Sequence, residues 1–344
     1  MAAKRQKKKK KNIIGILFVA VILVWLGATG FSWWRDYSPH PVDSATISAV
    51  TIKQGATTAQ IAQTLKENNI IKKPFFFRLV SKFGGHDGTY QQGEFELKTG
   101  MGYEEIFKAL KGIGKNPNSV KITIPEGYEL RQIADKLEEA GLINKTVFFD
   151  LIENEPFDYD FVRALPKREN RLEGYLFPDT YQFEKTDSEK TIINAMLKRF
   201  DEVYSEKYKA RAKELNMTTD QIVTLASIIE REAVGDTDRK DVSSVFHNRL
   251  KSQDMPYLQS CATVQYILKE RKTVLSEADT KIQSPYNTYI NKGLPVGPIA
   301  SPGEKSIEAA LYPNHTDYLF FVLDSSGTHR FSKTYEEHLA NMKK

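Results

Sequence analysis

The chain has 344 residues, of which 40% are hydrophobic and 27% are charged, so it is long enough for two or three domains with packed cores. Its formal net charge of +5 is concentrated at the N-terminus, where residues 1–11 include seven basic side chains and no acidic one. The rest of the chain is therefore close to neutral, which excludes a nucleic-acid-binding protein on grounds of charge. The single cysteine, Cys261, excludes an internal disulfide and a cysteine-rich metal site, and we expect it to be a small buried hydrophobe.

An uninterrupted apolar segment follows the basic tail at 1–12. Residues 13–34 contain no charged residue and include all three tryptophans. About 20 apolar residues suffice to cross a membrane, and flanking basic residues stay on the cytoplasmic side. We therefore expect an uncleaved transmembrane helix rather than a signal peptide, whose apolar region is shorter. After a linker at 35–46, the bulk of the chain is then expected outside the cell membrane, with the N-terminus in the cytoplasm.

An internal repeat organises the next part of the chain, because Thr51-Ile52 and Gly55 recur 72 residues later as Thr123-Ile124 and Gly127. Each copy predicts a short β-branched strand, a glycine turn and a helix with one apolar face. This unit is typical of carbohydrate-binding modules of the LysM type, although a generic βα packing unit without a ligand is the alternative. The prediction is an α+β protein with a small LysM-like βα domain at 47–117 and a larger mixed domain at 118–344.

The remaining elements follow in chain order. A strand at 93–97 and a helix at 103–110 belong to the small domain, and the turn-rich segment 112–119 marks its end. In the larger domain, helices are predicted at 146–154, 188–214, 219–233, 238–251 and 304–311. An apolar β-type run at 318–322, a turn at 324–327 and residues 329–331 then predict a hairpin.

Glu230 is the strongest candidate for acid–base chemistry. Thr218 and Gln221 form a capping box that begins a helix, and Glu230 ends an uncharged run of that helix. A carboxyl group among small and apolar neighbours is partly desolvated, and burial raises the pKa, as a proton donor requires. Glu232 is rotated to another side of the helix and is expected to face solvent. Periodicity alone leaves a surface role for Glu230 open.

Other polar residues lie in aromatic or constrained segments that suit sugar recognition by stacking and hydrogen bonding. The segment 284–303 is rich in proline and glycine and predicts a stiff, irregular loop, with an ordinary surface connection as the alternative. Motifs for nucleotide binding, zinc proteases and serine hydrolases do not occur, so no cofactor or metal is expected. The candidate substrate-binding residues are Glu173, Tyr175, Asp179, Gln259, Gln265, Tyr286, Asn287 and Tyr289.

Taken together, these segments resemble the endolytic murein transglycosylases, the MltG or YceG-like family. The resemblance rests on ordered motifs: EGYLFPDTYQF from Glu173, LASIIERE from Leu225, VFHNRL from Val245, SPYNTY from Ser284 and GLPVGPIASPG from Gly293. It implies a LysM-like module followed by a catalytic domain, with Glu230 in the position of the catalytic glutamate. One departure is Cys261, which stands after LQS where the family pattern has an acidic residue.

The resemblance also implies the reaction. It is the cleavage of the β-1,4 bond between N-acetylmuramic acid and N-acetylglucosamine of peptidoglycan without water, leaving a 1,6-anhydro end. Cutting of nascent strands would set their length, and peptidoglycan synthases and divisome or elongasome proteins are the partners implied. Two alternatives stay open. One is a hydrolytic muramidase with Glu173 or Asp179 as second carboxylate, and the other is a non-catalytic glycan-binding scaffold.

Overall fold

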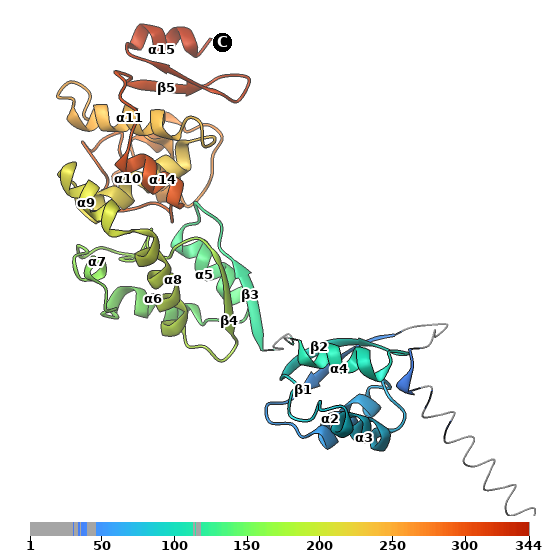
Figure 1. The fold of residues 1–344 in the computed structure, drawn as a ribbon. Helices are drawn as coiled ribbons and strands as arrows, with labels where there is room; N and C mark the ends of the chain where they lie inside the picture. Colours follow the sequence, from blue (N-terminus) through green and yellow to red (C-terminus); the bar gives the residue numbers. More distant parts are fainter. Residues whose placement is uncertain are drawn as a thin grey trace, which may run out of the picture. The chain divides into compact units, whose positions relative to one another are not determined.

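The computed structural model describes residues 30, 34, 36–39, 46–112, 114 and 118–343, and the chain divides into two compact units, Met1–Ser119 and Val120–Lys344 (Figure 1). Each unit has its own hydrophobic core. Helices and small two-stranded sheets make up both units, which confirms a mixed α+β fold. The predicted transmembrane segment at 13–34 lies outside the described residues except for Gly30 and Trp34. Among the residues that are described, no helix has the length and apolar character needed to span a membrane.

Unit 1 consists of two antiparallel strands and three helices. The elements are β1 (Ile47–Ile52), α2 (Thr58–Glu67), α3 (Pro74–Phe83), β2 (Gly93–Lys98) and α4 (Tyr103–Lys111). In the sheet, Val50 lies opposite Phe95, and both side chains are buried. The capping box of Thr57 and Gln60 begins α2, and its apolar face buries Ile61 and Leu65. The strand, turn and helix predicted for the first repeat copy are therefore confirmed.

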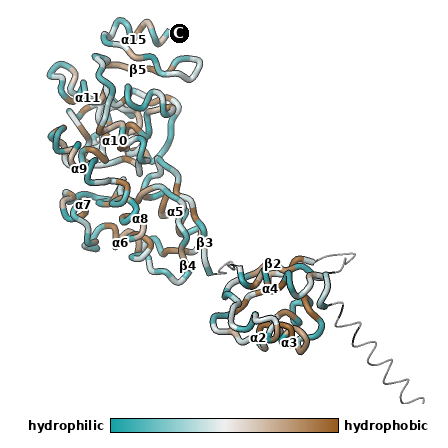
Figure 2. The backbone as a smooth tube through the Cα atoms, viewed as in Figure 1, coloured by the Kyte–Doolittle hydropathy of each residue, from teal (hydrophilic) through white to brown (hydrophobic). Residues whose placement is uncertain are grey.

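The first half of unit 2 repeats this arrangement and then extends it. Its elements are β3 (Ser119–Thr123), α5 (Leu130–Glu139), α6 (Lys145–Asn154), α7 (Asp160–Arg163), β4 (Thr180–Glu184) and α8 (Glu189–Val203), with β3 paired to β4. Glu129 and Gln132 form the capping box of α5, at the positions that Thr57 and Gln60 occupy in the first copy. Figure 2 shows hydrophobic and hydrophilic residues alternating along these helices, as amphipathic helices on a shared core require.

The predicted helix at 188–214 is wrong, because the segment forms two helices, α8 and α9 (Glu206–Glu214). Tyr204 leaves the helical conformation and its ring stacks on Phe200 in the core. Ser205 follows in an extended conformation and takes the N-cap position of α9, a position that serine favours. The apolar periodicity continues through the break, and so the sequence pattern did not reveal it.

The second half of unit 2 is built around α10 (Thr219–Glu232). Every residue from Ile222 to Ile229 is buried, because α10 packs against α9, α11 (Arg239–Lys251), α12 (Cys261–Leu268) and α14 (Glu304–Leu311). The short helix α13 (Glu277–Thr280) follows α12. The antiparallel hairpin of β5 (Phe320–Leu323) and β6 (His329–Ser332), with α15 (Tyr335–Asn341), lies at the end of unit 2 away from β3 and β4 (Figure 1). The helices predicted at 146–154, 219–233, 238–251 and 304–311 and the C-terminal hairpin are confirmed, with shifts of one or two residues at their ends.

Candidate active site

Glu230 lies in the last turn of the central helix α10, and its carboxyl group contacts polar groups from two other segments. The side chain is only 8% exposed, so the alternative of a surface residue is not supported. The Gly303 N–H donates to Glu230 Oε2 at 3.0 Å, and Arg239 Nη2 lies 3.4 Å from Oε1. Two donors from different segments therefore hold the two oxygens of one buried carboxyl group.

The proline- and glycine-rich loop at 293–303 brings Gly303 to this position. The Ile299 N–H donates to Ser227 Oγ on α10 at 3.0 Å, which fastens the loop along the helix. A side chain at Gly297 would overlap the Arg168 guanidinium, so that position needs glycine. The loop is irregular, as predicted, its residues 297–303 are buried, and its end provides a backbone donor to Glu230.

Arg239 is held in place by a network of charges at the start of α11. Its Nη1 donates to Asp236 Oδ1 at 2.6 Å, and Lys305 at the start of α14 pairs with the other oxygen of Asp236. Asp238 lies beside His329 of the C-terminal hairpin at 2.5 Å and accepts the backbone N–H groups of the loop before α11. These contacts fix the segment that presents Arg239 to Glu230.

Glu126 is a member of the site that the sequence reasoning missed. It is an exposed residue of the turn between β3 and α5, and a methyl group placed on Gly303 would overlap its carboxylate. Burial of part of the side chain and the charge of Glu230 raise the pKa of Glu126, while Arg239 and Lys305 oppose the shift. The internal repeat could have indicated Glu126 from the sequence. Its turn, Glu126-Gly127, corresponds to a turn in the first copy that lines a groove in unit 1.

Glu173 and Tyr286, two of the predicted substrate-binding residues, line a cavity of 290 Å³ in unit 2. Glu173 is 1% exposed, and it accepts hydrogen bonds from the Leu130 N–H at 2.9 Å and from Tyr266 Oη at 3.1 Å. Burial outweighs these bonds and raises the pKa of Glu173 to about 8. The rings of Tyr266 and Tyr286 pack 4.9 Å apart. The cavity is therefore aromatic on one side, with a carboxyl group that is largely neutral at pH 7.

Three other predicted substrate-binding residues form hydrogen bonds or an ion pair within the protein. Tyr175 and Asn287 are fully buried, with Tyr175 donating to Asp220 at 2.9 Å and Asn287 donating to the carbonyl groups of Thr280 and Ile282. These contacts favour structural roles over direct contact with a glycan. Asp179 pairs with Arg199 at 2.7 Å. Burial would raise the pKa of Asp179, but the hydrogen bonds from Arg199 and the Thr180 N–H leave it lowered.

The remaining candidates lie on α12 or beside it. Gln259 is exposed, Gln265 donates to the Lys272 carbonyl at 2.9 Å, and Tyr289 Oη lies 3.1 Å from Cys261 Sγ. The expectation that Cys261 is buried is wrong, because the first position of α12 is exposed. The expectation that Glu232 faces solvent is also wrong. Its Oε1 accepts the Ala262 N–H at 3.2 Å and the Ser260 hydroxyl, and so it caps α12.

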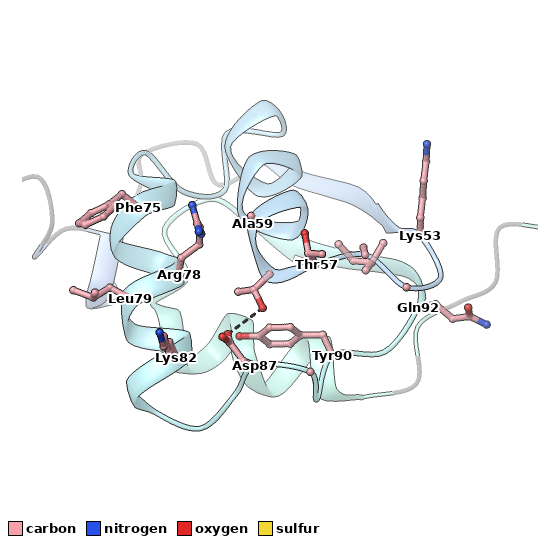
Figure 3. Close-up of a pocket in the computed structure, with 15 residues that line it drawn as sticks. Lys53, Thr57, Ala59, Phe75, Arg78, Leu79, Lys82, Asp87, Tyr90 and Gln92 are labelled. Atoms are coloured by element: carbon pink, nitrogen blue, oxygen red, sulfur yellow. Dashed lines mark hydrogen bonds between the residues drawn. The ribbon is translucent and has the colours of Figure 1, made fainter.

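Unit 1 contains a groove of 720 Å³ between the turn after β1, helix α3 and the segment before β2 (Figure 3). Tyr90 and Asp87 lie along it, and Thr58 Oγ1 donates to Asp87 at 3.0 Å. Lys53, Arg78 and Lys82 are the basic residues of the lining, which gives the groove a positive character. An aromatic ring among polar and basic side chains suits a sugar chain that bears carboxylates.

Known proteins of similar sequence match the part of the chain that contains this site. The model of the YceG-like family matches residues 50–344, and the two repeat copies, Glu230 and the 293–303 loop all fall within that match. The chain belongs to the YceG-like family. It is 37% identical over 311 residues to the endolytic murein transglycosylase of Bacillus subtilis, covering 87% of this chain and 85% of that protein. It is also 31% identical to the endolytic murein transglycosylase of Streptococcus pneumoniae strain D39, where it spans 65% of the longer protein.

A solved structure of this YceG-like family is similar as well. The crystal structure of a putative yceG-like protein from Listeria monocytogenes aligns with a TM-score of 0.60 and 36% identity, covering 86% of this chain and 98% of that one. The family resemblance inferred from the motifs is therefore confirmed over most of the chain.

Proposed function

We propose that this protein is an endolytic lytic transglycosylase that cleaves peptidoglycan strands between N-acetylmuramic acid and N-acetylglucosamine, with Glu230 as its acid and base. The observation that supports it best is the buried Glu230 carboxyl group with one donor on each oxygen, from Gly303 and Arg239. The relatives in Bacillus subtilis and Streptococcus pneumoniae bear the name of this activity.

The surroundings of Glu230 suit both halves of the reaction. Protonated Glu230 donates to the glycosidic oxygen as the C–O bond breaks, which leaves a carboxylate. The Gly303 N–H and Arg239 stabilise the negative charge that forms at that moment, and such preorganised donors are a main source of catalysis. The carboxylate then takes the proton of the muramic acid 6-hydroxyl while that oxygen bonds to the anomeric carbon. The nucleophile belongs to the same sugar, so its effective concentration is high.

The test distinguishes this reaction from hydrolysis. The full chain in detergent is incubated with polymeric peptidoglycan in ¹⁸O-labelled water, and the new ends are analysed by mass spectrometry. The proposal predicts 1,6-anhydro-muramic ends without label, and their absence from the Glu230→Gln variant. Reducing ends with ¹⁸O would contradict it and support a muramidase with Glu173 or Asp179 as second carboxylate. Intact strands would support a glycan-binding scaffold.

We further propose that unit 1 is a LysM-like module that binds the same glycan in the groove of Figure 3. The support is the strand, turn and helix arrangement together with the basic and aromatic lining. Binding of the full-length Glu230→Gln variant to peptidoglycan, measured by co-sedimentation, is expected to weaken severalfold when Arg78→Ala is added. The matched control is Lys66→Ala, which removes an exposed cation of α2 that lies outside that lining. Equal binding by both double variants would contradict the proposal that glycan binds in this groove.

The location of the protein is a proposal from the sequence. The uncharged segment at 13–34 and the basic tail before it favour a single-pass anchor with both units outside the cell membrane. Peptidoglycan synthases and divisome or elongasome proteins are the proposed partners. Fractionation tests the anchor: the full chain should remain with membranes after a high-salt wash, and a chain lacking residues 1–34 should be released. Release of both would contradict it.

A further inference from the structure

Two carboxyl groups, those of Glu126 and Glu230, meet at Gly303. The Gly303 N–H donates to Glu230 Oε2 at 3.0 Å, while the space that a side chain on Gly303 would fill is taken by the carboxylate of Glu126. Glu230 is buried and Glu126 is exposed, so Glu126 lies on the side that solvent and a glycan can reach. The absence of a side chain at Gly303 leaves room for the Glu126 carboxylate at this position.

The backbone around Glu126 is fixed to the same framework as Glu230. The Gly127 N–H donates to the Ser301 carbonyl, and the Ser301 N–H donates to the Tyr128 carbonyl, each at 2.8 Å. Arg231, the residue after Glu230, donates from Nη1 to the Gly127 carbonyl at 3.0 Å. The turn that bears Glu126 is thus bound both to the 301–303 segment and to α10, so the position of Glu126 is not that of a free surface side chain.

The charges that face this pair come from each neighbouring element. Glu230 belongs to α10, Asp236 to the following loop, Arg239 to α11 and Lys305 to α14. Partial burial and the charge of Glu230 raise the pKa of Glu126, and the two cations reduce the shift. Glu126 therefore adds a second negative charge next to Glu230, opposite the positive charges of Arg239 and Lys305.

We propose that Glu126 is a positioning residue of this site: its carboxylate lies beside that of Glu230 at Gly303, and the repulsion between two negative charges disfavours a site in which both carboxyl groups are ionised. The inference rests on the proposed transglycosylase function. In the reaction the proton moves from the pair to the glycosidic oxygen, and the 6-hydroxyl returns a proton to the pair as the anhydro bond forms.

The experiment is the pH dependence of kcat/KM for release of anhydro ends by the full chain in detergent, from about pH 5 to about pH 9. Glu126→Gln should move the basic limb of the profile down by about half a pH unit to one unit, because water screens an exposed charge. Activity on the basic side then falls about threefold to tenfold, and the acidic side changes little. Glutamine fits this kind of turn, since Gln54 occupies the equivalent position in the first repeat copy.

Two further variants make the outcome decisive. Glu126→Asp keeps the charge on a shorter side chain and should give a limb between those of wild type and Glu126→Gln, which also serves if the glutamine variant does not fold. Glu138→Gln, which removes one exposed carboxylate of α5, should leave the limb unchanged. A loss that is equal at every pH, or no change in either Glu126 variant, would overturn the carboxyl pair. Absence of anhydro ends from wild type at every pH would instead overturn the proposed function.

Discussion

The two repeat copies contain the same turn in two different surroundings. Gly55 and Gly127 both have positive φ, +72° and +75°, and each lies between a β-branched strand and a helix with a capping box. A side chain at Gly55 would meet open space, because this turn lines the groove of unit 1. At Gly127 it would lie 3.6 Å from the side chains of Glu230 and Arg231. One local structure therefore borders a groove in unit 1 and the candidate active site in unit 2.

The difference lies in what packs against the turn. In unit 2 the turn is bound to α10 and to the segment before α14, through Arg231 and Ser301, and Gln54 of the first copy is replaced by Glu126. The second copy thereby gains a carboxylate beside Gly303 and loses the open space. Local sequence similarity predicts the backbone of such a unit, whereas its chemistry depends on the neighbouring segments.

The largest effect that would sharpen this comparison is expected from Gly303→Ala. The added methyl group overlaps the carboxylate of Glu126, an exposed side chain that must then move away from Glu230, so cleavage should fall by about tenfold. The measurement is the rate of anhydro-end release. Gly235→Ala, which places its methyl group in open space, should retain most activity, and equal rates for Gly303→Ala and wild type would contradict the geometry.

The second prediction is that Glu173 makes the stability of unit 2 depend on pH. Its pKa in the folded chain is about 8 against an ordinary value of 4.5, so the neutral form is favoured in the fold. The stabilisation is complete below the lower value and is lost as the pH rises toward 8, by about 1.4 kcal/mol for each pH unit.

Chemical denaturation at about pH 5 and about pH 8 tests this prediction. Glu173→Gln should flatten the fall in the free energy of unfolding between these values. The same slope in wild type and variant would mean that Glu173 is not held neutral.

A smaller effect should separate the two glycine turns directly. Gly55→Ala and Gly127→Ala each force a residue with a side chain into positive φ, at a cost of about 1–2 kcal/mol in unfolding free energy. Only Gly127→Ala should also lower the cleavage rate, because the strained turn carries Glu126 and its carbonyl group accepts from Arg231, the residue after Glu230. Equal losses of cleavage in both variants would break the proposed difference between the two copies.

The sequence predicted the elements whose patterns are local. The repeat, the capping box of α10 and the run of buried residues before Glu230 all followed from spacing and residue type. The break at Tyr204 was missed because the apolar period continues across it. Helix α12 was missed because its short sequence, Cys261 to Leu268, has no charged residue to define a polar face.

The site was predictable only in part, for a physical reason. Glu230 stood out through its own helix, but Glu126, Arg239 and Gly303 approach it from three other segments, and no local pattern relates them. Tyr175 and Asn287 belong to motifs that suggest sugar contact, yet burial and internal hydrogen bonds favour structural roles for both. Motif membership by itself does not distinguish a residue that touches the ligand from one that supports the loop.

The most direct test of the central claim is the rate of glycan cleavage by Glu230→Gln beside that of Glu232→Gln. Both variants remove one carboxylate from the last turn of α10, but Glu230 meets Gly303 and Arg239, whereas Glu232 caps α12. Cleavage should fall by at least about 100-fold in Glu230→Gln, as expected for loss of a general acid, and stay within a fewfold of wild type in Glu232→Gln. Retained cleavage in Glu230→Gln, or an equal loss in both variants, would contradict the assignment of Glu230.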